Sequence, residues 1–295
     1  NLLRCHYCDL KEMVPSSCPD CRSKRLRHSG VGTEKVVAEI SRRFPDARVL
    51  RLDRDTVRNH RLLRQALGAF SRGEYDILVG TQMVAKGHDF PGVNLVGILL
   101  ADTGLHFPDF RAAERTWQLV TQVAGRAGRG DERGLAIIQT FSPNHYAIES
   151  AAKGESDEFF RRELEYRRTL GYPPFGRLVK ILLSGKVEEK VREEAARIGE
   201  ILRQAVSADG SDGAPNSGGL SDLKKTGAGA LASRPRILGP APAPLNRLQG
   251  KFRIQILIKS PTSAVNQRLL ERVKDRLKPR RGVDLVLDVD PQSML

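Results

Sequence analysis

The stretches GTQMVAKGHDFP (residues 80–91) and QVAGRAGR (residues 122–129) decide how this chain folds. The second stretch holds two arginines, Arg126 and Arg129, each placed directly after a glycine. Arginine stays charged at any working pH and presents a planar fork of donors that matches phosphate oxygens. The glycines let the backbone approach a ligand closely, because they lack a Cβ. The pattern predicts two guanidinium groups close to a triphosphate, although a basic turn that holds some other anion would have the same sequence.

The residues around the first stretch predict a parallel β-sheet. A mostly apolar run at residues 76–79 leads into Gly80, and a second run covers residues 95–100. Such strands, separated by helical stretches, are typical of a parallel sheet covered on both faces. Ligands of these sheets bind at the carboxyl ends of the strands. The fold class expected for this part of the chain is α/β.

Upstream of these strands, the sequence predicts two helices with a strand between them. The helices are expected at residues 35–44 and 62–70, and the strand at residues 49–52. Thr33 is placed to cap the first helix. Because exposed amides at a helix start suit an anion, Gly32 and Thr33 are either contacts to a nucleic-acid phosphate or parts of an ordinary capped helix.

A further helix is expected at residues 111–123, and a further strand at residues 134–139. The helix carries Trp117, the single tryptophan of the chain. Val120 and Ala124 lie at helical spacing from it, which favours packing inside the domain. The alternative is an indole that stacks on a nucleic-acid base.

All four cysteines lie near the start of the chain, in two C-x-x-C pairs. Cys5 and Cys8 form one pair, and Cys18 and Cys21 form the other. Two such pairs are typical of a tetrahedral zinc site with four thiolate ligands. A redox pair is the alternative, while disulfides are not expected in a reducing cytoplasm. Spacing alone predicts one zinc ion.

After Gly171 the pattern changes to β-α-β-β-α-β, the split βαβ plan of ferredoxin-like domains. The expected strands are residues 177–184, 237–245, 252–259 and 283–289, and the expected helices are residues 187–206 and 263–278. Prolines break the second strand, which places it at an edge. Residues 207–233, rich in Gly, Ser, Ala and Asp, are expected to form a flexible loop.

Together the motifs resemble the second motor lobe of superfamily 2 DNA helicases, most closely the PriA-type primosomal helicases. The resemblance rests on residues 80–91, 109–129 and 171–175 (GYPPF), and continues to residues 288–291 (DVDP), so it covers nearly the whole chain. It implies a RecA-like second helicase lobe with a zinc-knuckle insertion, followed by an α+β ferredoxin-like C-terminal domain. The expected boundaries are residues 1–28 for a partial zinc-binding segment, 29–165 for the lobe, and 166–295 for the C-terminal domain.

The resemblance also implies roles for single residues. Arg126 and Arg129 would reach the β- and γ-phosphates of ATP, and Gln122 would lie near the γ-phosphate. Asp89 would accept a hydrogen bond from the ribose, with Gly87 leaving space for it. The residues expected to meet the DNA backbone are Gly32, Thr33, Thr81 and Gln82.

The sequence contains no GxxxxGK[ST] phosphate loop and no acidic Walker-B strand. The lysine that reaches the phosphates and the carboxylate that holds Mg²⁺ are therefore expected elsewhere. The chain, which begins at Asn1, is interpreted as the C-terminal part of a longer enzyme whose other lobe binds most of the ATP and Mg²⁺. By itself it is expected to be inactive.

The zinc prediction changes under the resemblance. PriA-type helicases hold two zinc ions with eight cysteines in interleaved pairs. This implies that Cys5 and Cys8 belong to one ion, that Cys18 and Cys21 belong to the other, and that each ion is half-liganded by this chain.

The charge agrees with a polyanionic partner. Lys and Arg number 49 against 35 Asp and Glu, which gives a net charge of +14 and a pI near 10.0. Such a chain binds polyanions with release of counterions, although ribosomal and membrane-surface proteins are equally basic. No apolar run of 18 or more residues and no signal peptide occurs, so the expected location is the bacterial cytoplasm.

The function expected is the C-terminal portion of an ATP-dependent 3′-to-5′ DNA helicase that recognises stalled or forked DNA and initiates replication restart. There are two alternatives. One is a double-strand DNA translocase or remodeller, and the other is a non-enzymatic module that binds zinc and nucleic acid. The resemblance implies forked and single-stranded DNA, single-strand DNA-binding protein and other primosome proteins as partners of a monomer. The basic helix at residues 263–278 either meets an acidic partner or is a solvated charged face.

Overall fold

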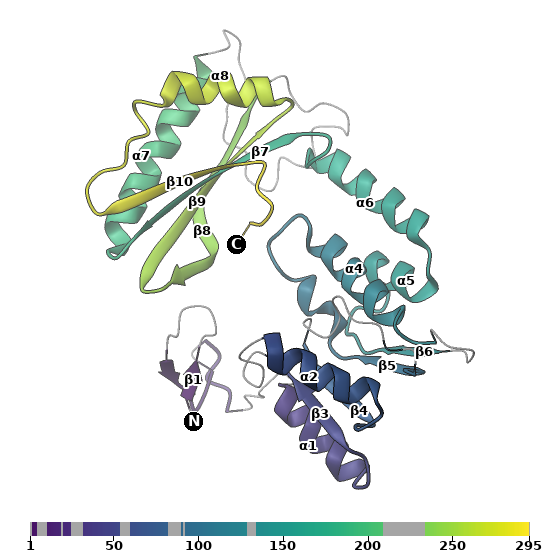
Figure 1. The fold of residues 1–295 in the computed structure, drawn as a ribbon. Coiled ribbons are helices and arrows are strands. Elements are labelled where there is room, and N and C mark those ends of the chain that lie inside the picture. The colour runs from purple at the N-terminus through teal and green to yellow at the C-terminus, as the bar shows by residue number, and fades with distance from the viewer. Residues whose placement is uncertain are drawn as a thin grey trace. The chain divides into compact units, whose positions relative to one another are not determined.

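The computed structural model describes residues 2–4, 11–18, 20–24, 32–53, 60–81, 90, 92–128, 134–208 and 234–294. Helices and strands are mixed along the chain (Figure 1). The chain divides into two compact units. Unit 1 comprises Asn1–Val14, Phe107–Arg111 and Phe160–Leu295, and unit 2 comprises Pro15–His106 and Ala112–Phe159. Most of the loop expected at residues 207–233 lies outside the described residues.

The first part of unit 2 is a parallel strand pair with two helices. β3 (Val49–Leu52) pairs with β4 (Ile77–Gly80), and both α1 (Thr33–Arg43) and α2 (His60–Ser71) contact β3. Their core includes Leu52 and Leu67 from these elements, together with Phe90. These elements lie within two residues of the expected positions, because the apolar spacing that predicted them is what forms the core.

A second parallel pair in unit 2 joins β5 (Leu95–Ile98) to β6 (Leu135–Ile138). The 3₁₀ helix η1 (Ala101–Gly104) follows β5, and α4 (Ala112–Ala124) and α5 (Tyr146–Lys153) pack against one face of the pair. The expected packing of Trp117 is confirmed: it belongs to this core, and its ring stacks on Phe159 with 4.5 Å between centroids.

The opposite face of this pair differs from the prediction. Leu95, Leu135 and Ile137 are 58%, 58% and 55% exposed. Side chains alternate across a strand, so helices on one face leave every second residue uncovered. Within the described ranges, the pair is covered on one face only, whereas the sequence predicted cover on both.

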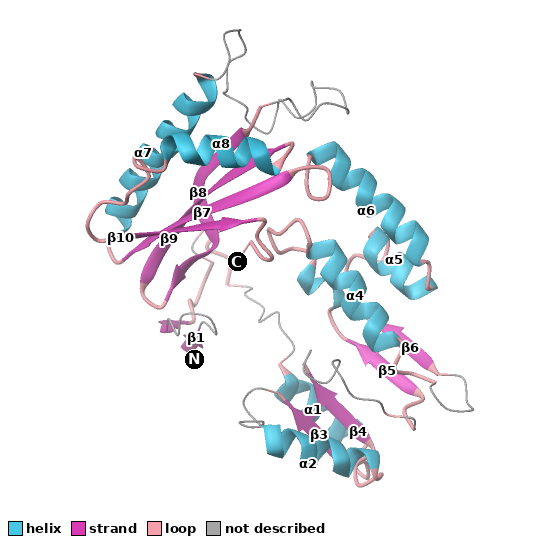
Figure 2. Cartoon of the chain, turned by 45° about the horizontal axis from the view of Figure 1, so that its top comes forward, coloured by secondary structure: helices cyan, strands magenta, loops and turns pink. Residues whose placement is uncertain are grey.

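Unit 1 is built around an antiparallel sheet. Its elements are β7 (Arg177–Gly185), α7 (Glu188–Ser207), β8 (Arg236–Leu248), β9 (Lys251–Ser260), α8 (Ser263–Val273) and β10 (Val283–Val289). The spatial order is β10-β7-β9-β8, and every neighbouring pair is antiparallel. The element order along the chain is the expected one. Both helices pack on the same side of the sheet (Figure 2), over a core that includes Ile181, Ile256 and Leu269.

β8 is an edge strand, as its prolines predicted. Its pairing with β9 is irregular between Leu238 and Ala241 and again between Pro242 and Arg247. Proline has no backbone N–H to donate to a ladder, so a strand that contains several of them is confined to an edge.

A buried carboxylate joins α7 to the segment after α8. Glu194 is 2% exposed and accepts hydrogen bonds from Nε and Nη2 of Arg197, at 3.0 and 2.5 Å, and from the backbone N of Arg280, at 3.1 Å. Arg197 also donates to the carbonyl oxygens of Arg276 and Lys278, each at 3.0 Å. The hydrogen bonds from Arg197 hold the pKa of Glu194 below its usual value.

Several elements were not predicted. They are the hairpin of β1 (Leu2–Arg4) and β2 (Lys11–Met13), together with α5 and α6 (Ser156–Leu170). In α6 the buried side includes an ion pair, Glu163 with Arg167 at 2.7 Å, which a search for apolar spacing cannot detect. Among the helices of the described ranges, none is long and apolar enough to cross a membrane.

Candidate nucleotide and nucleic-acid site

The described residues hold only part of the predicted site. The structure describes seven of the predicted site residues: Gln122, Arg126, Gly32, Thr33, Thr81, Cys18 and Cys21. Six others lie outside the described residues: Arg129, Gly87, Asp89, Gln82, Cys5 and Cys8. The structure places the described members in three separate groups: the turn after α4, the start of α1 with the end of β4, and the segment that carries Cys18 and Cys21.

The turn after α4 carries Arg126. Gln122 is exposed in the last turn of the helix, and Arg126 follows it by four residues. The backbone N of Arg126 donates to the carbonyl of Val123, and that of Ala127 to Ala124, both at 3.1 Å. These i to i−3 bonds tighten the chain beyond the helix end. Arg126 is thus held on a short hydrogen-bonded turn rather than on a loose loop.

Glycines give this turn its shape. Gly128 has φ +72°, a left-handed conformation that favours glycine, and its N donates to the carbonyl of Val93 at 3.0 Å. A Cβ added to Gly134 would collide with the backbone of Ala127 and Gly128. Val93 precedes β5 and Gly134 precedes β6, so the turn lies at the amino ends of this strand pair. The turn thus does not share the carboxyl edge at which ligands of such sheets are expected to bind, because α4 runs back along the strands before the turn begins.

Thr33 does not cap α1 as predicted. Gly32 is the N-cap residue and makes no side-chain cap bond, while Thr33 is the first helical residue. The Thr33 hydroxyl donates to Oδ2 of Asp53 at 2.6 Å, and Arg51 Nε donates to the same oxygen at 2.6 Å. Asp53 is 5% exposed, and a buried carboxylate requires donors, which explains why it recruits the hydroxyl.

Two of the predicted DNA contacts nevertheless share one edge. Leu52 and Gly80 are register partners in the parallel pair, so Asp53 and Thr81 follow the strands at the same carboxyl edge. Thr33 joins them through its bond to Asp53. Thr81 is exposed at this edge.

Among the described residues of this edge, Arg51 is paired with carboxylates. Arg51 pairs with Asp53 at 2.6 Å and with Glu34 at 2.9 Å, and the hydrogen bond to Asp53 raises its pKa. Among the described residues, the start of α1 and the exposed Thr81 also lie at this edge. Arg51 and Asp53 stand two residues apart at the end of β3, and this spacing, which puts both side chains on one face, is the sequence signal that would have found their ion pair.

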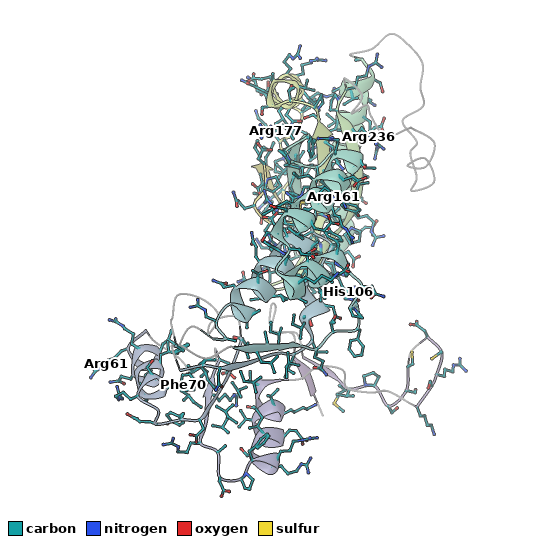
Figure 3. All side chains as sticks on the ribbon, turned by 90° about the vertical axis from the view of Figure 1, so that its right-hand side faces the viewer. Arg61, Phe70, His106, Arg161, Arg177 and Arg236 are labelled. Atoms are coloured by element: carbon teal, nitrogen blue, oxygen red, sulfur yellow. The ribbon has the colours of Figure 1, made fainter. Side chains whose placement is uncertain are left out.

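A second buried aspartate was missed by the sequence reasoning. Asp102 accepts from Oγ1 of Thr140 at 2.7 Å and from the backbone N of Phe141 at 2.9 Å, and these bonds hold its pKa below the usual value. The nearby His106 side chain is exposed (Figure 3). Through these hydrogen bonds Asp102 links η1, which follows β5, to the residues that follow β6. It therefore stabilises the carboxyl ends of the β5–β6 pair.

Cys18 and Cys21 lie in one hydrogen-bonded turn. The backbone N of Cys18 donates to Ser23 O and that of Arg22 to Cys18 O, both at 2.9 Å, and Arg22 adopts φ +56°. Hydrogen bonds from the backbone of Cys21 and Asp20 lower the pKa of the Cys18 thiol. They thereby favour the thiolate, which is the form that binds metals. No group of three or more potential metal ligands occurs among the residues the structure places, so this turn supplies two donors.

Two protein families and several curated relatives are similar to this chain. The family described as "Helicase conserved C-terminal domain" matches residues 23–131, and the family described as "Primosomal protein N C-terminal domain" matches residues 168–292. Curated relatives named "Replication restart protein PriA" match 99% of this chain. The protein from Bacillus subtilis is 38% identical over 297 residues, that from Treponema pallidum 39% over 293, and that from Synechocystis 40% over 293. The chain spans 34%, 41% and 32% of their lengths, respectively.

Proposed function

We propose that this chain is the C-terminal portion of an ATP-dependent DNA helicase, because it is related over nearly its whole length to the C-terminal part of the replication restart protein PriA. The helicase would move 3′ to 5′, recognise stalled or forked DNA and initiate replication restart. The observation that carries the proposal is the hydrogen-bonded, glycine-shaped turn that holds Arg126 at the end of α4, in a chain without a phosphate loop. An arginine so placed suits a nucleotide that is held by another lobe.

In this proposal the chain acts on the phosphates rather than binding the whole nucleotide. Arg126 and Arg129 reach the β- and γ-phosphates and stabilise charge on the transferring group, with Gln122 near the γ-phosphate. Asp89 accepts from the ribose hydroxyl beside Gly87. ATP and Mg²⁺ are bound mainly by the first lobe.

The DNA backbone is assigned to the carboxyl edge of β3 and β4. Gly32 and Thr33 present the start of α1, and Thr81 and Gln82 follow β4. Because the Thr33 hydroxyl is committed to Asp53, its contribution to a phosphate would come from the backbone amide. When the two lobes close on ATP, the DNA contacts at this edge would then move relative to the DNA contacts of the first lobe.

The domain boundaries at residues 1–28, 29–165 and 166–295 are kept as part of the proposal. The sheet order β10-β7-β9-β8 supports a ferredoxin-like plan for the last domain. The proposed partners are forked and single-stranded DNA, single-strand DNA-binding protein and other primosome proteins, and the proposed location is the bacterial cytoplasm.

Strand separation by the full-length protein tests this function. Duplexes with a 3′ or a 5′ single-stranded tail are mixed with protein and ATP, and release of the labelled strand is followed by fluorescence. We expect release from the 3′-tailed duplex and little from the 5′-tailed one. ATP-driven displacement of a triplex-forming strand without duplex separation would instead favour the double-strand translocase.

Zinc is proposed to bind the four cysteines as halves of two sites. Cys18 and Cys21 fit this role through their turn and the lowered pKa of Cys18, and bound zinc would contribute folding energy to the segment. We expect the isolated chain to hold well under one zinc per molecule and to release it readily to a chelator, as measured by atomic emission.

Two results would change the metal assignment. Close to one tightly held zinc per chain would mean a single site with four thiolate ligands from Cys5, Cys8, Cys18 and Cys21. Metal that survives the double substitution Cys5→Ser and Cys18→Ser would remove both pairs from the assignment.

A further inference from the structure

Side chains of β9 point to the two faces of the unit 1 sheet. Ile254, Ile256 and Ile258 belong to the core beneath α7 and α8, which lie on one side of the sheet (Figure 2). Successive side chains of a strand alternate between the faces, so the residues between these isoleucines lie on the other face, which we call the outer face. On β9 the outer face consists of Lys251, Arg253, Gln255, Leu257 and Lys259.

Arg253 is a buried cation of the outer face. It is 9% exposed, and among the described residues it donates from Nη1 to the carbonyl oxygen of Leu245, at 3.3 Å. Within the same part of the chain, no carboxylate forms an ion pair with it, and burial lowers the pKa of its guanidinium. An unpaired charge is costly to remove from water. A bound anion would therefore stabilise this position.

The carboxylates that β10 places on the outer face are paired with other cations. Asp284 is the register partner of Ser184, which is in turn the partner of Arg253, so all three share a row across the sheet. Even so, Oδ2 of Asp284 lies 2.6 Å from Nζ of Lys251. Asp288, two positions further from this row than Val286, lies 3.4 Å from Nζ of Lys180. Neither aspartate compensates the charge of Arg253.

Gln255 adds a second polar group without a partner. Its Oε1 is buried and accepts no hydrogen bond among the residues that the structure describes. Buried polar atoms are normally paired. Gln255 follows Arg253 by two residues on the same face, a separation of ~7 Å along the strand. A charge without a counterion and an acceptor without a donor thus adjoin, which points to a polar ligand at this place.

Positive charge recurs further along β9. Lys259 lies six residues beyond Arg253 on the outer face, ~20 Å along the strand, and its register partner on β8 is Arg236. Burial and the nearby charge of Arg236 lower the pKa of Lys259 to about 8. Nζ of Lys259 contacts the carbonyl oxygen of Leu170, at 2.6 Å, and the ring of Tyr172, neither of which is an anion. The strand therefore presents cations at two separated positions.

We propose that Arg253 binds a backbone phosphate of DNA on the outer face of the β7–β10 sheet. A planar guanidinium fork matches two oxygens of one phosphate. Two cationic positions ~20 Å apart suit an extended polyanion and not a single small anion. The proposal deepens the proposed function, on which it rests, by adding a DNA contact in the domain that follows the helicase lobe.

The test measures how DNA binding by the full-length protein depends on salt. A single-stranded oligonucleotide, a duplex and a fork are each titrated by fluorescence anisotropy at several salt concentrations. For Arg253→Gln we expect Kd to rise ~3- to 10-fold, because one phosphate contact is lost. The slope of log Kd against log salt should fall by ~0.7 on the single strand or by ~0.9 on the duplex. The DNA form whose slope changes identifies the strand that the outer face binds.

Three further variants separate a phosphate contact from a structural role. Arg253→Lys keeps the charge and should restore most of the slope. The control Arg192→Gln removes an equal charge from an exposed pair with Glu188 on α7, and it should leave the slope unchanged. Gln255→Glu places a carboxylate beside Arg253, so it should weaken DNA binding as Arg253→Gln does while raising the melting midpoint. If Arg253→Gln does not fold, Gln255→Glu is judged by the same criteria.

An unchanged slope on all three DNA forms, in a folded Arg253→Gln or in Gln255→Glu, would overturn the phosphate contact and leave Arg253 as a structural residue bound to Leu245. An equal loss in Arg192→Gln would overturn it as well, because any arginine of the domain would then have the same effect. Failure of the wild-type protein to bind any of the three DNA forms would instead refute the proposed function, so the two failures are distinguishable.

Discussion

Replacing Arg126 by alanine in the full-length protein is expected to lower ATP hydrolysis by at least ~10³-fold, as removal of an arginine finger does in GTPases. In its proposed role, the Arg126 guanidinium stabilises the charge that develops on the transferring phosphoryl group, and its hydrogen-bonded turn would hold it in place for this. Steady-state phosphate release at saturating forked DNA measures the effect.

Arg126→Lys is expected to fail nearly as badly. An ammonium keeps the charge but lacks the planar fork that matches two phosphate oxygens. A control is offered by Arg192→Ala, which removes an equal charge from an exposed position on α7 and should leave hydrolysis unchanged. If lysine restored most of the activity, Arg126 would act only as a general positive charge.

Replacing Glu194 by alanine is expected to destabilise the isolated chain by ~3 kcal/mol, because it leaves the partly buried Arg197 without its carboxylate. The same change unties α7 from the segment that includes Arg280. Urea unfolding followed by circular dichroism measures the loss. Glu200→Ala on the same helix is the matched control, since Glu200 and Arg203 form a largely exposed pair worth ~1 kcal/mol or less.

The Glu194 contribution should depend on pH in a defined direction. Its pKa is lowered in the folded protein, so its stabilisation is complete above the ordinary carboxyl pKa and is lost as pH falls through the lowered value. The difference in unfolding free energy between wild type and Glu194→Gln should therefore shrink in acid. A difference that stays constant from neutral pH to strongly acidic pH would show that the charge of Glu194 is not what stabilises the fold.

The sequence predicted the bounds of several strands closely. β3 and β10 have the predicted bounds, and β9 extends one residue beyond its prediction at each end, because each is a short apolar or alternating run that sends some of its side chains into a core. α6 was missed because it buries a charged pair, Glu163 with Arg167, in place of a continuous apolar stripe. The spacing of apolar residues in the sequence thus predicts a helix or strand only when apolar side chains are what it buries.

The sequence predicted the motifs of the candidate site, but it did not predict the hydrogen bonds that join residues distant along the chain. Nothing in the local sequence indicated that the Thr33 hydroxyl would turn away from a capping position to serve Asp53, 20 residues away. The bond between Asp109 and Met294 spans 185 positions and involves a backbone amide, which carries no residue signature. Such contacts are fixed by tertiary packing, and only the folded chain reveals them.

One paired measurement tests the central claim most directly: ATP turnover and the Kd for forked DNA, determined for wild type and Arg126→Ala at the same fixed salt concentration. Arg126 is assigned to the nucleotide, whereas DNA affinity comes from many phosphate contacts that weaken about one at a time. The predicted result is loss of turnover with a Kd within ~2-fold of wild type. A Kd that rises in proportion to the loss of turnover would contradict the account, since Arg126 would then be a DNA contact in a basic turn.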